Sequence, residues 1–271
     1  MLKFFLALIL FVVPLTACAH SQNFSLDGDH GKLSAVLQTP DAQKNFPLVI
    51  ICHGFTGNKD SLLLTSLADD LEARGIASIR FDFNGHGQSD GSFQDMTVLN
   101  EIEDAKKVFE YASRLPNVTS ISIAGHSQGG VVASMVAGEL GAKKIKAVVL
   151  MAPAAVLRDD AIRGNLFGVT YDSINPPAFV EIFGGHKVGR NYILSAQTLP
   201  IYETAEKFTG PALMIHGKAD VIVPYTYSLS YKKIFRRGEV KLLDGADHSF
   251  RGEENLVAKI VADFFALRLM K

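Results

Sequence analysis

The chain has 271 residues, of which 48% are hydrophobic, so it is long enough to bury one sizeable core as a single α/β domain. Its 27 basic and 28 acidic residues nearly cancel, which excludes an electrostatic case for nucleic-acid binding. The eight histidines are scattered and no Cys/His cluster has metal-ligand spacing, so the sequence predicts neither a metal nor another cofactor.

The chain begins with the features of a targeting segment. Lys3 precedes an apolar run at residues 4–13 (FFLALILFVV), which is too short to span a bilayer comfortably and is followed by Pro14. A basic residue followed by a short apolar run is typical of a signal peptide, so we exclude residues 1–17 from the folded domain.

A cysteine directly follows this segment. The tetrad LTAC at residues 15–18 resembles the lipobox of bacterial lipoproteins, in which the cysteine is lipidated and becomes the first mature residue. The resemblance implies lipidation of Cys18, a tether at residues 18–23, and a protein held at the bacterial cell envelope by its lipid anchor alone. An ordinary secretory signal, and hence a secreted protein, is the alternative. With Cys18 lipidated, Cys52 has no intrachain disulfide partner and is expected to be a buried core residue.

From residue 24 onward, apolar strands alternate with helices. Two short alternating segments at 24–28 and 32–38 predict an antiparallel edge hairpin. Apolar runs predict further strands at 47–52, 77–83, 120–124, 147–151, 212–216 and 240–243. Helices are predicted at about 60–74, 99–114, 128–140, 225–234 and 253–269. Continuous Val, Ile and Leu runs joined by helices predict an α/β fold, with a mostly parallel eight-stranded sheet covered by helices on both faces.

One region departs from this alternation. Between residue 153 and about residue 207, the sequence has no clean strand–helix unit. A structureless stretch of roughly fifty residues is too long for a loop in a compact domain. We therefore expect the domain at 24–271 to carry a small cap insertion at about 154–207, packed over the top of the sheet.

A candidate nucleophile lies between a strand and a helix. The pentapeptide GHSQG at residues 125–129 follows the strand predicted at 120–124 and begins the next helix. This G-x-S-x-G pattern is the nucleophile elbow in the context it requires, because glycines must flank a serine held in a strained turn. The helix N-terminus adds positive partial charge beneath the reacting centre. The pattern predicts that Ser127 is a nucleophile.

Two later loops supply candidates for a base and for the acid that orients it. His248 follows the last predicted strand, at the sheet edge where it can reach Ser127 and take its proton. Asp220 directly follows the strand at 212–216. Asp244 and Asp247 are closer in sequence to the histidine, but a residue one position away cannot easily fold back to its Nδ1 atom. The expected triad is therefore Ser127, Asp220 and His248.

These motifs resemble the α/β-hydrolase superfamily from about residue 24 to the end of the chain. The chain order Ser127, Asp220, His248 is the order that this fold uses. The resemblance implies an oxyanion hole made from two backbone N–H groups. One belongs to Gln128, the residue after the nucleophile, and the other to Phe55, in the glycine-containing loop after the strand at 47–52.

A closer resemblance is to bacterial cinnamoyl (feruloyl) esterases. It rests on HGFTGNKD (53–60), FDFNGHGQSDG (81–91), GHSQGGVVASM (125–135), APAAVLRDDAIRGN (152–165), GVTY (168–171) and AQTLPIYE (196–203). In those esterases the insertion forms the wall of the pocket for the aromatic acyl group. The resemblance implies that Asp160 meets the phenolic hydroxyl of the substrate. Phe167 stands where those esterases tend to carry a polar residue, which leaves room for less polar cinnamates.

The sequence thus predicts a serine esterase that cleaves hydroxycinnamate esters, either small molecules or esters attached to plant polysaccharide, through an acyl-enzyme. A short-chain carboxylesterase, a monoacylglycerol lipase or a serine peptidase would use the same core residues, which cannot separate these activities. A binding protein that has lost catalysis is the alternative from another class, although the triad residues are all present. The oligomeric state is left open, a homodimer included.

Overall fold

The computed structural model describes residues 20–40 and 45–270. The predicted signal peptide and Cys18 lie outside the described residues. Within the two described stretches, no helix is both long enough and apolar enough to cross a membrane. Cys52 is a buried free cysteine, as predicted.

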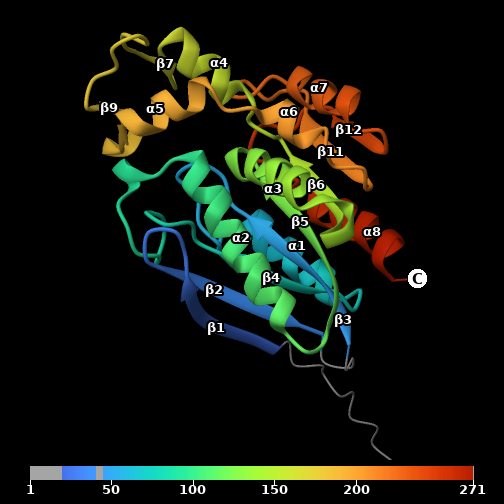
Figure 1. Ribbon diagram of the computed structural model, residues 1–271. Coiled ribbons are helices and arrows are strands. Elements are labelled where there is room, and N and C mark those ends of the chain that lie inside the picture. The colour runs from blue at the N-terminus through green and yellow to red at the C-terminus, as the bar shows by residue number, and fades with distance from the viewer. Residues whose placement is uncertain (1–19, 41–44, 271) are drawn as a thin grey trace, which may run out of the picture.

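A mostly parallel sheet of eight strands forms the centre of the domain, as predicted (Figure 1). Its order is β1-β2-β4-β3-β5-β6-β11-β12. Strand β2 runs antiparallel to both of its neighbours, β1 and β4, and the other neighbouring strands of this sheet are parallel. The strands are β1 (His20–Asp27), β2 (Lys32–Thr39), β3 (Phe46–Cys52), β4 (Ala77–Phe81), β5 (Val118–His126), β6 (Ile145–Met151), β11 (Ala212–Gly217) and β12 (Gly238–Leu243).

Helices cover both faces of the sheet because its central strands are apolar on both sides. In β3, Val49 and Ile51 belong to one core, whereas Leu48 and Ile50 belong to the other. The first core is closed by α1 (Leu62–Glu72) and α8 (Glu254–Leu269). The second is closed by α2 (Val98–Arg114), α3 (Gln128–Lys144) and α7 (Thr226–Ile234). The strand alternation thus decides which helices a given side chain meets.

The chain between β6 and β11 forms short elements above the carboxyl ends of the strands (Figure 1). Its two hairpins are β7–β8 and β9–β10, and α6 packs on α3. The elements are α4 (Val156–Arg163), β7 (Asn165–Leu166), β8 (Val169–Thr170), β9 (Phe179–Glu181), β10 (Lys187–Gly189), α5 (Arg190–Gln197) and α6 (Ile201–Ala205). Two 3-10 turns complete the fold, η1 (Phe93–Asp95) before α2 and η2 (Phe183–Gly185) after β9.

Several predicted boundaries differ from those of the structure, and two of the differences have a clear physical reason. Residues 20–23 were expected to be a tether, but they form the first half of β1, with His20 opposite Thr39. They pair because β2 continues to Thr39 and offers its outer backbone groups as partners. Strand β4 ends at Phe81 rather than at residue 83, because the Phe83 backbone N–H donates to the His53 ring at 3.1 Å instead of to a neighbouring strand.

Candidate active site

The turn between β5 and α3 holds Ser127 in an unusual backbone conformation. Its φ is 54° and its ψ is −121°, a region that side chains other than glycine rarely adopt. The turn is so tight that a Cβ atom on Gly125 would lie 2.0 Å from the Gly129 carbonyl oxygen. The glycines of the GHSQG motif are therefore required sterically, and the turn raises the serine hydroxyl above the carboxyl edge of the sheet.

Three side chains from three loops meet at this turn. The Ser127 Oγ atom lies 2.9 Å from Nε2 of His248, and Nδ1 of the same ring lies 2.7 Å from Oδ2 of Asp220. The loops follow β5, β12 and β11, and the carboxyl ends of parallel strands share one sheet edge. In this geometry the histidine can accept the serine proton while the aspartate holds the ring in place.

The Asp220 carboxylate is held through both of its oxygens. Oδ1 accepts hydrogen bonds from the backbone N–H groups of Ile222 (2.9 Å) and Val223 (2.8 Å). Oδ2 faces the imidazoles of His248 and His216. Burial raises the pKa of Asp220, but the hydrogen bonds to the two histidines outweigh burial and hold the pKa well below its usual range. The group that faces the His248 ring is therefore a carboxylate.

The two rival aspartates have other partners. Asp247 Oδ1 accepts from the backbone N–H groups of Ser249 and Arg251, both at 3.0 Å, and so caps the loop that carries His248. Asp244 forms an exposed ion pair with Lys218. Neither carboxylate is hydrogen-bonded to the His248 ring, whose Nδ1 faces Asp220 instead.

Two cavities open at Ser127. The first has a volume of about 390 Å³ and is lined by Phe55, Ser127 and Gln128 together with residues of the insertion. The second has a volume of about 500 Å³ and also reaches Ser127, but it includes His248 in its wall. Phe55, Phe167 and Ile222 border both cavities. The serine thus lies between two spaces, each of a size that holds small organic ligands.

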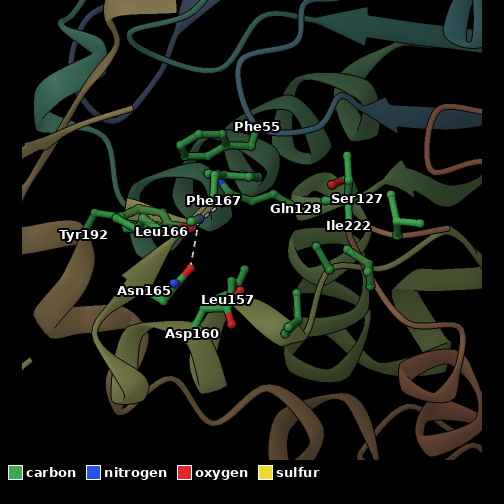
Figure 2. Close-up of a pocket in the computed structure, with 15 residues that line it drawn as sticks. Phe55, Ser127, Gln128, Leu157, Asp160, Asn165, Leu166, Phe167, Tyr192 and Ile222 are labelled. Carbon is green, nitrogen blue, oxygen red and sulfur yellow. Dashed lines mark hydrogen bonds between the residues drawn. The ribbon is translucent and has the colours of Figure 1, made fainter. Parts of the chain in front are cut away.

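Three aromatic residues line the first cavity. Figure 2 shows Ser127 at one end, Tyr192 at the other, and Phe55 beside Phe167 along one wall. The Phe55 ring centroid lies 5.2 Å from that of Phe167 and 5.8 Å from that of Tyr192. Asp160 lies across the cavity from the phenylalanines (Figure 2). A planar ring could pack against this wall with one polar edge toward the carboxylate.

The two binding residues implied by the resemblance both line this cavity. Asp160 is in α4, one turn from Arg163, whose guanidinium donates to it at 2.9 Å. Phe167 lies in the two-residue turn between β7 and β8 with a φ of 49°, which is rare for a bulky residue. The half-exposed ring packs at a tilt against Phe55 and edge-to-face against Phe183. Packing at the entrance thus offsets a strained backbone.

The two expected oxyanion donors also border the first cavity. The Gln128 N–H is among the first of α3, where no acceptor within the helix is available, and the helix dipole favours negative charge there. Phe55 lies in the loop after β3, where a Cβ on Gly54 would come within 2.9 Å of the Ser127 Cβ. The loop is therefore packed directly against the nucleophile.

Sequence reasoning missed a buried network behind this wall. The Tyr192 hydroxyl donates to Oε1 of Gln128 at 2.7 Å, and the Gln128 amide nitrogen lies 3.0 and 2.9 Å from the two Glu101 oxygens. Burial raises the pKa of the Glu101 carboxyl to about 8, although the Gln128 hydrogen bonds act in the opposite direction. The partners are 27 and 64 residues apart, so no local pattern could reveal them.

Metal ligands are not grouped in the part of the chain that the structure describes. Across residues 20–40 and 45–270, no set of three His, Cys, Asp or Glu side chains could hold a metal ion together.

Several known proteins are similar to this chain. A family model described as serine aminopeptidase, S33, matches residues 43–171. An Escherichia coli protein described as an uncharacterized 31.7 kDa protein in the traX-finO intergenic region is 31% identical over 100 residues, which are 36% of this chain and 35% of that protein. The match to the uncharacterized protein YfhR of Escherichia coli O157:H7 covers 58% of its length. The chain therefore spans less than two thirds of these curated relatives.

Two further relatives are covered over most of their length. A putative esterase/lipase of Mycoplasma genitalium is 27% identical over 243 residues, which are 78% of this chain and 84% of that protein. A structure of Est1E from Butyrivibrio proteoclasticus with ferulic acid bound superimposes on this chain with a TM-score of 0.87 and a sequence identity of 34%. The match covers 90% of this chain and 98% of the Est1E chain. With this identity and coverage, the chain belongs to the α/β-hydrolase superfamily, and it resembles the cinnamoyl and feruloyl esterases.

Proposed function

We propose that this protein is a serine carboxylic ester hydrolase that cleaves hydroxycinnamate esters through an acyl-enzyme. The observation that carries the proposal is the hydrogen-bonded chain from Ser127 through His248 to Asp220, which opens into an aromatic cavity of about 390 Å³. The similar Est1E chain, whose structure contains ferulic acid, supports an aromatic acid as the acyl group.

The geometry suggests how the two half-reactions would proceed. Ser127 Oγ attacks the ester carbonyl as His248 Nε2 takes its proton, and the backbone N–H groups of Gln128 and Phe55 stabilise the oxyanion. When the tetrahedral intermediate collapses, the carbon–oxygen bond to the alcohol breaks and the imidazolium returns the proton to the leaving oxygen. Water, deprotonated by the same ring, then attacks the acyl-enzyme and releases the acid and Ser127.

The two cavities distinguish the acyl side from the alcohol side. The leaving alcohol must lie where His248 can protonate it, and His248 lines only the larger cavity of about 500 Å³. The acyl group therefore belongs in the smaller aromatic cavity with Asp160 and Tyr192. The size of the larger cavity suits an alcohol well beyond methanol or ethanol.

The polar atoms of the acyl cavity suit a phenol that donates its proton. Asp160 offers carboxylate oxygens, which only accept hydrogen bonds once ionised. The Tyr192 hydroxyl gives its proton to Gln128, so its remaining capacity toward a ligand is also as an acceptor. Both groups therefore favour a free phenolic hydroxyl over a methoxy group. Phe167 adds an apolar ring to the cavity wall beside Phe55. This ring suits the unsaturated chain that joins the phenol of a cinnamate to its carbonyl group.

The experiment is a comparison of kcat/KM for methyl ferulate and for p-nitrophenyl butyrate, measured on protein that starts at Ala19. The triad alone predicts turnover of the activated butyrate. Turnover of methyl ferulate at a comparable kcat/KM, despite its poor leaving group, is expected if the insertion binds the aromatic acyl group. Hydrolysis of the butyrate alone would leave a serine esterase whose substrate is not a cinnamate.

A peptidase is the second candidate, favoured by the description of the matching family model. Asp160 could also bind the ammonium group of an amino-terminal residue in the acyl cavity. Aminoacyl p-nitroanilides added to the same assay separate the two, because an esterase of this kind should leave their amide bonds intact. Turnover of the anilides in preference to the esters would replace the esterase proposal.

We also propose that lipidation of Cys18 holds the enzyme at the bacterial cell envelope. The support is the LTAC tetrad directly after the apolar run at residues 4–13. Such an enzyme would meet esters that arrive from outside the cytoplasm. Membrane fractionation of Cys18→Ala tests this part of the proposal separately from the chemistry.

A further inference from the structure

We propose that His216 is a positioning residue that fixes the Asp220 carboxylate and thereby sets the pH range in which His248 can act as a base. This inference rests on the proposed serine esterase mechanism. His216 does not touch the reacting atoms, and it lies near the end of β11, four residues before Asp220.

The contacts of His216 lead directly to the triad. Its Nε2 atom lies 3.0 Å from Oδ2 of Asp220, the same oxygen that lies 2.7 Å from Nδ1 of His248. Its Nδ1 atom lies 2.7 Å from the Ser228 hydroxyl of α7. The ring and Ser228 are both completely buried. A continuous chain of side chains thus runs from α7 through Asp220 to Ser127.

The surroundings of the His216 ring determine which nitrogen carries the proton. Nε2 faces two acceptors, the Asp220 carboxylate and the Val223 carbonyl oxygen at 2.9 Å. A nitrogen lone pair there would meet only other lone pairs, so Nε2 must be protonated and must donate. Nδ1 can then accept the Ser228 hydroxyl proton, which satisfies the neutral ring. His216 therefore presents an N–H donor to Asp220 permanently.

The Nε2–H group of His216, as a second donor to Oδ2 of Asp220, affects His248 in two ways. It completes four hydrogen bonds to Asp220, two on each oxygen, so the carboxylate has no freedom to rotate away from His248. It also draws negative charge from Oδ2, the oxygen that stabilises the His248 imidazolium. Without His216, Oδ2 would stabilise that cation more strongly. His248 would then remain protonated, and unable to accept the serine proton, up to a higher pH.

Other charged or titratable groups also face His248, and they must stay constant in any test. The ring of His126 at the end of β5 lies with its centroid 5.1 Å away. His53, directly after β3, lines the same cavity as His248. Further groups lie on the loop of His248 itself and at the start of α8, where they line that cavity or cap the loop: Asp247, Arg251 and Glu254. None of these groups is hydrogen-bonded to Oδ2 of Asp220, the oxygen that faces both His216 and His248.

The test compares His216→Met with His216→Gln. The two side chains have similar length and volume, but only glutamine can donate to Asp220. Two measurements are made on each purified protein: NMR titration of the His248 ring, and the pH profile of kcat/KM for p-nitrophenyl butyrate. The methionine variant is expected to shift the His248 titration and the acid limb of the profile upward by about one pH unit, the size expected for one lost hydrogen bond to a charged group. The glutamine variant should remain close to the wild type.

A purely structural role for His216 gives a different result. Both variants would then lose thermal stability alike, and any loss of activity would be uniform across pH. A folded methionine variant with a wild-type titration, or equal shifts in both variants, would overturn the proposal. If the methionine variant does not fold, Ser228→Ala replaces it, because loss of the Nδ1 partner should give a smaller upward shift. A wild-type titration in Ser228→Ala would then overturn the proposal as well.

The two proposals fail in different ways. The NMR titration requires no turnover, so it reports on the contact between His216, Asp220 and His248 even in an inactive protein. Hydrolysis that survives in Ser127→Ala would instead refute the serine mechanism. That result would leave the titration shift unchanged.

Discussion

The His126 ring, next to the nucleophile in the chain, lies with its Nε2 atom 2.9 Å from the backbone carbonyl oxygen of His248. Burial lowers the pKa of His126 to about 4, so the ring is neutral near pH 7. Because a carbonyl oxygen can only accept, the Nε2 atom of His126 carries the proton and its N–H group donates a hydrogen bond to the His248 backbone. The turn that holds Ser127 is thereby connected to the backbone of its partner.

We expect His126→Leu to reduce kcat for p-nitrophenyl butyrate by about ten- to a hundredfold, because the His248 loop would no longer be held at the correct distance. His126→Gln keeps a donor of similar reach and should recover most of this loss. Steady-state kinetics with circular dichroism as a folding control provide the measurement. Equal activity in both variants would show that the hydrogen bond does not position the base.

Ser127→Ala should lower kcat by at least about a thousandfold and leave the thermal unfolding midpoint essentially unchanged, because only a hydroxyl is removed. A fluorophosphonate probe should label the wild type at Ser127 and fail to label the variant. Ester hydrolysis near the wild-type rate in purified Ser127→Ala would rule out this serine as the nucleophile.

Asp160→Asn should discriminate between substrates. It keeps the shape of the side chain but removes the charge that would accept a phenolic hydrogen bond. We expect kcat/KM for methyl caffeate to fall by about tenfold, whereas that for methyl cinnamate, which has no phenol, should stay within about twofold. An equal loss for both esters would place the effect of Asp160 in folding or in general packing instead.

Glu101 predicts how stability depends on pH. Its folded-state pKa of about 8 is above the ordinary value of 4.5, so between these values the folded chain keeps a proton that the unfolded chain releases. The free energy of unfolding should therefore decrease as the pH rises through this window. Glu101→Gln is neutral at every pH and should show a flatter dependence of the urea midpoint between about pH 5 and pH 8.

Asp104 also contributes to the pH dependence of the urea midpoint, and it is present in both the wild type and Glu101→Gln. Burial raises its pKa to about 6, so it acts in the same direction over the lower part of the window in both proteins. Identical slopes in wild type and Glu101→Gln would show that Glu101 does not titrate in this range.

Cys18→Ala should move the protein from the membrane fraction to the soluble fraction without changing kcat/KM, because the lipid and the chemistry are separate. Ser127→Ala, expressed in the same way, should remain with the membranes and serves as the control. If Cys18→Ala stayed with the membranes, the lipoprotein interpretation would be wrong, and an ordinary signal or another means of attachment would replace it.

Much of the fold could be predicted because short, local sequence patterns determine its strands, its helices and the turn at Ser127. The buried strands are continuous apolar runs, and the nucleophile elbow needs its glycines at fixed positions around Ser127. The insertion could be located but not described. Its strands β7 and β8 have two residues each, and periodicity cannot be recognised in so short a segment.

The missed parts of the site depend on contacts between distant residues. His216 lies in an apolar strand, where its sequence context suggests only a buried residue. Its role follows from the alternation of β11, which places it on the α7 side next to Ser228. Tyr192 lies in the insertion, and its hydrogen bond to Gln128 joins residues 64 positions apart. Such pairings become visible only when the sheet brings the segments together.

The pairing of β1 with β2 also determines at which end of the sheet the N-terminal segment enters the domain. His20 is opposite Thr39, and the neighbouring Gln38 pairs with Ser78 at the start of β4, so the chain enters the sheet at the end opposite Ser127. The two residues from Cys18 to His20 can reach no more than about 7 Å. A lipid on Cys18 would therefore hold this end toward the bilayer and turn the catalytic mouth toward the surrounding water. Substrates would then arrive by diffusion from the medium rather than laterally within the membrane.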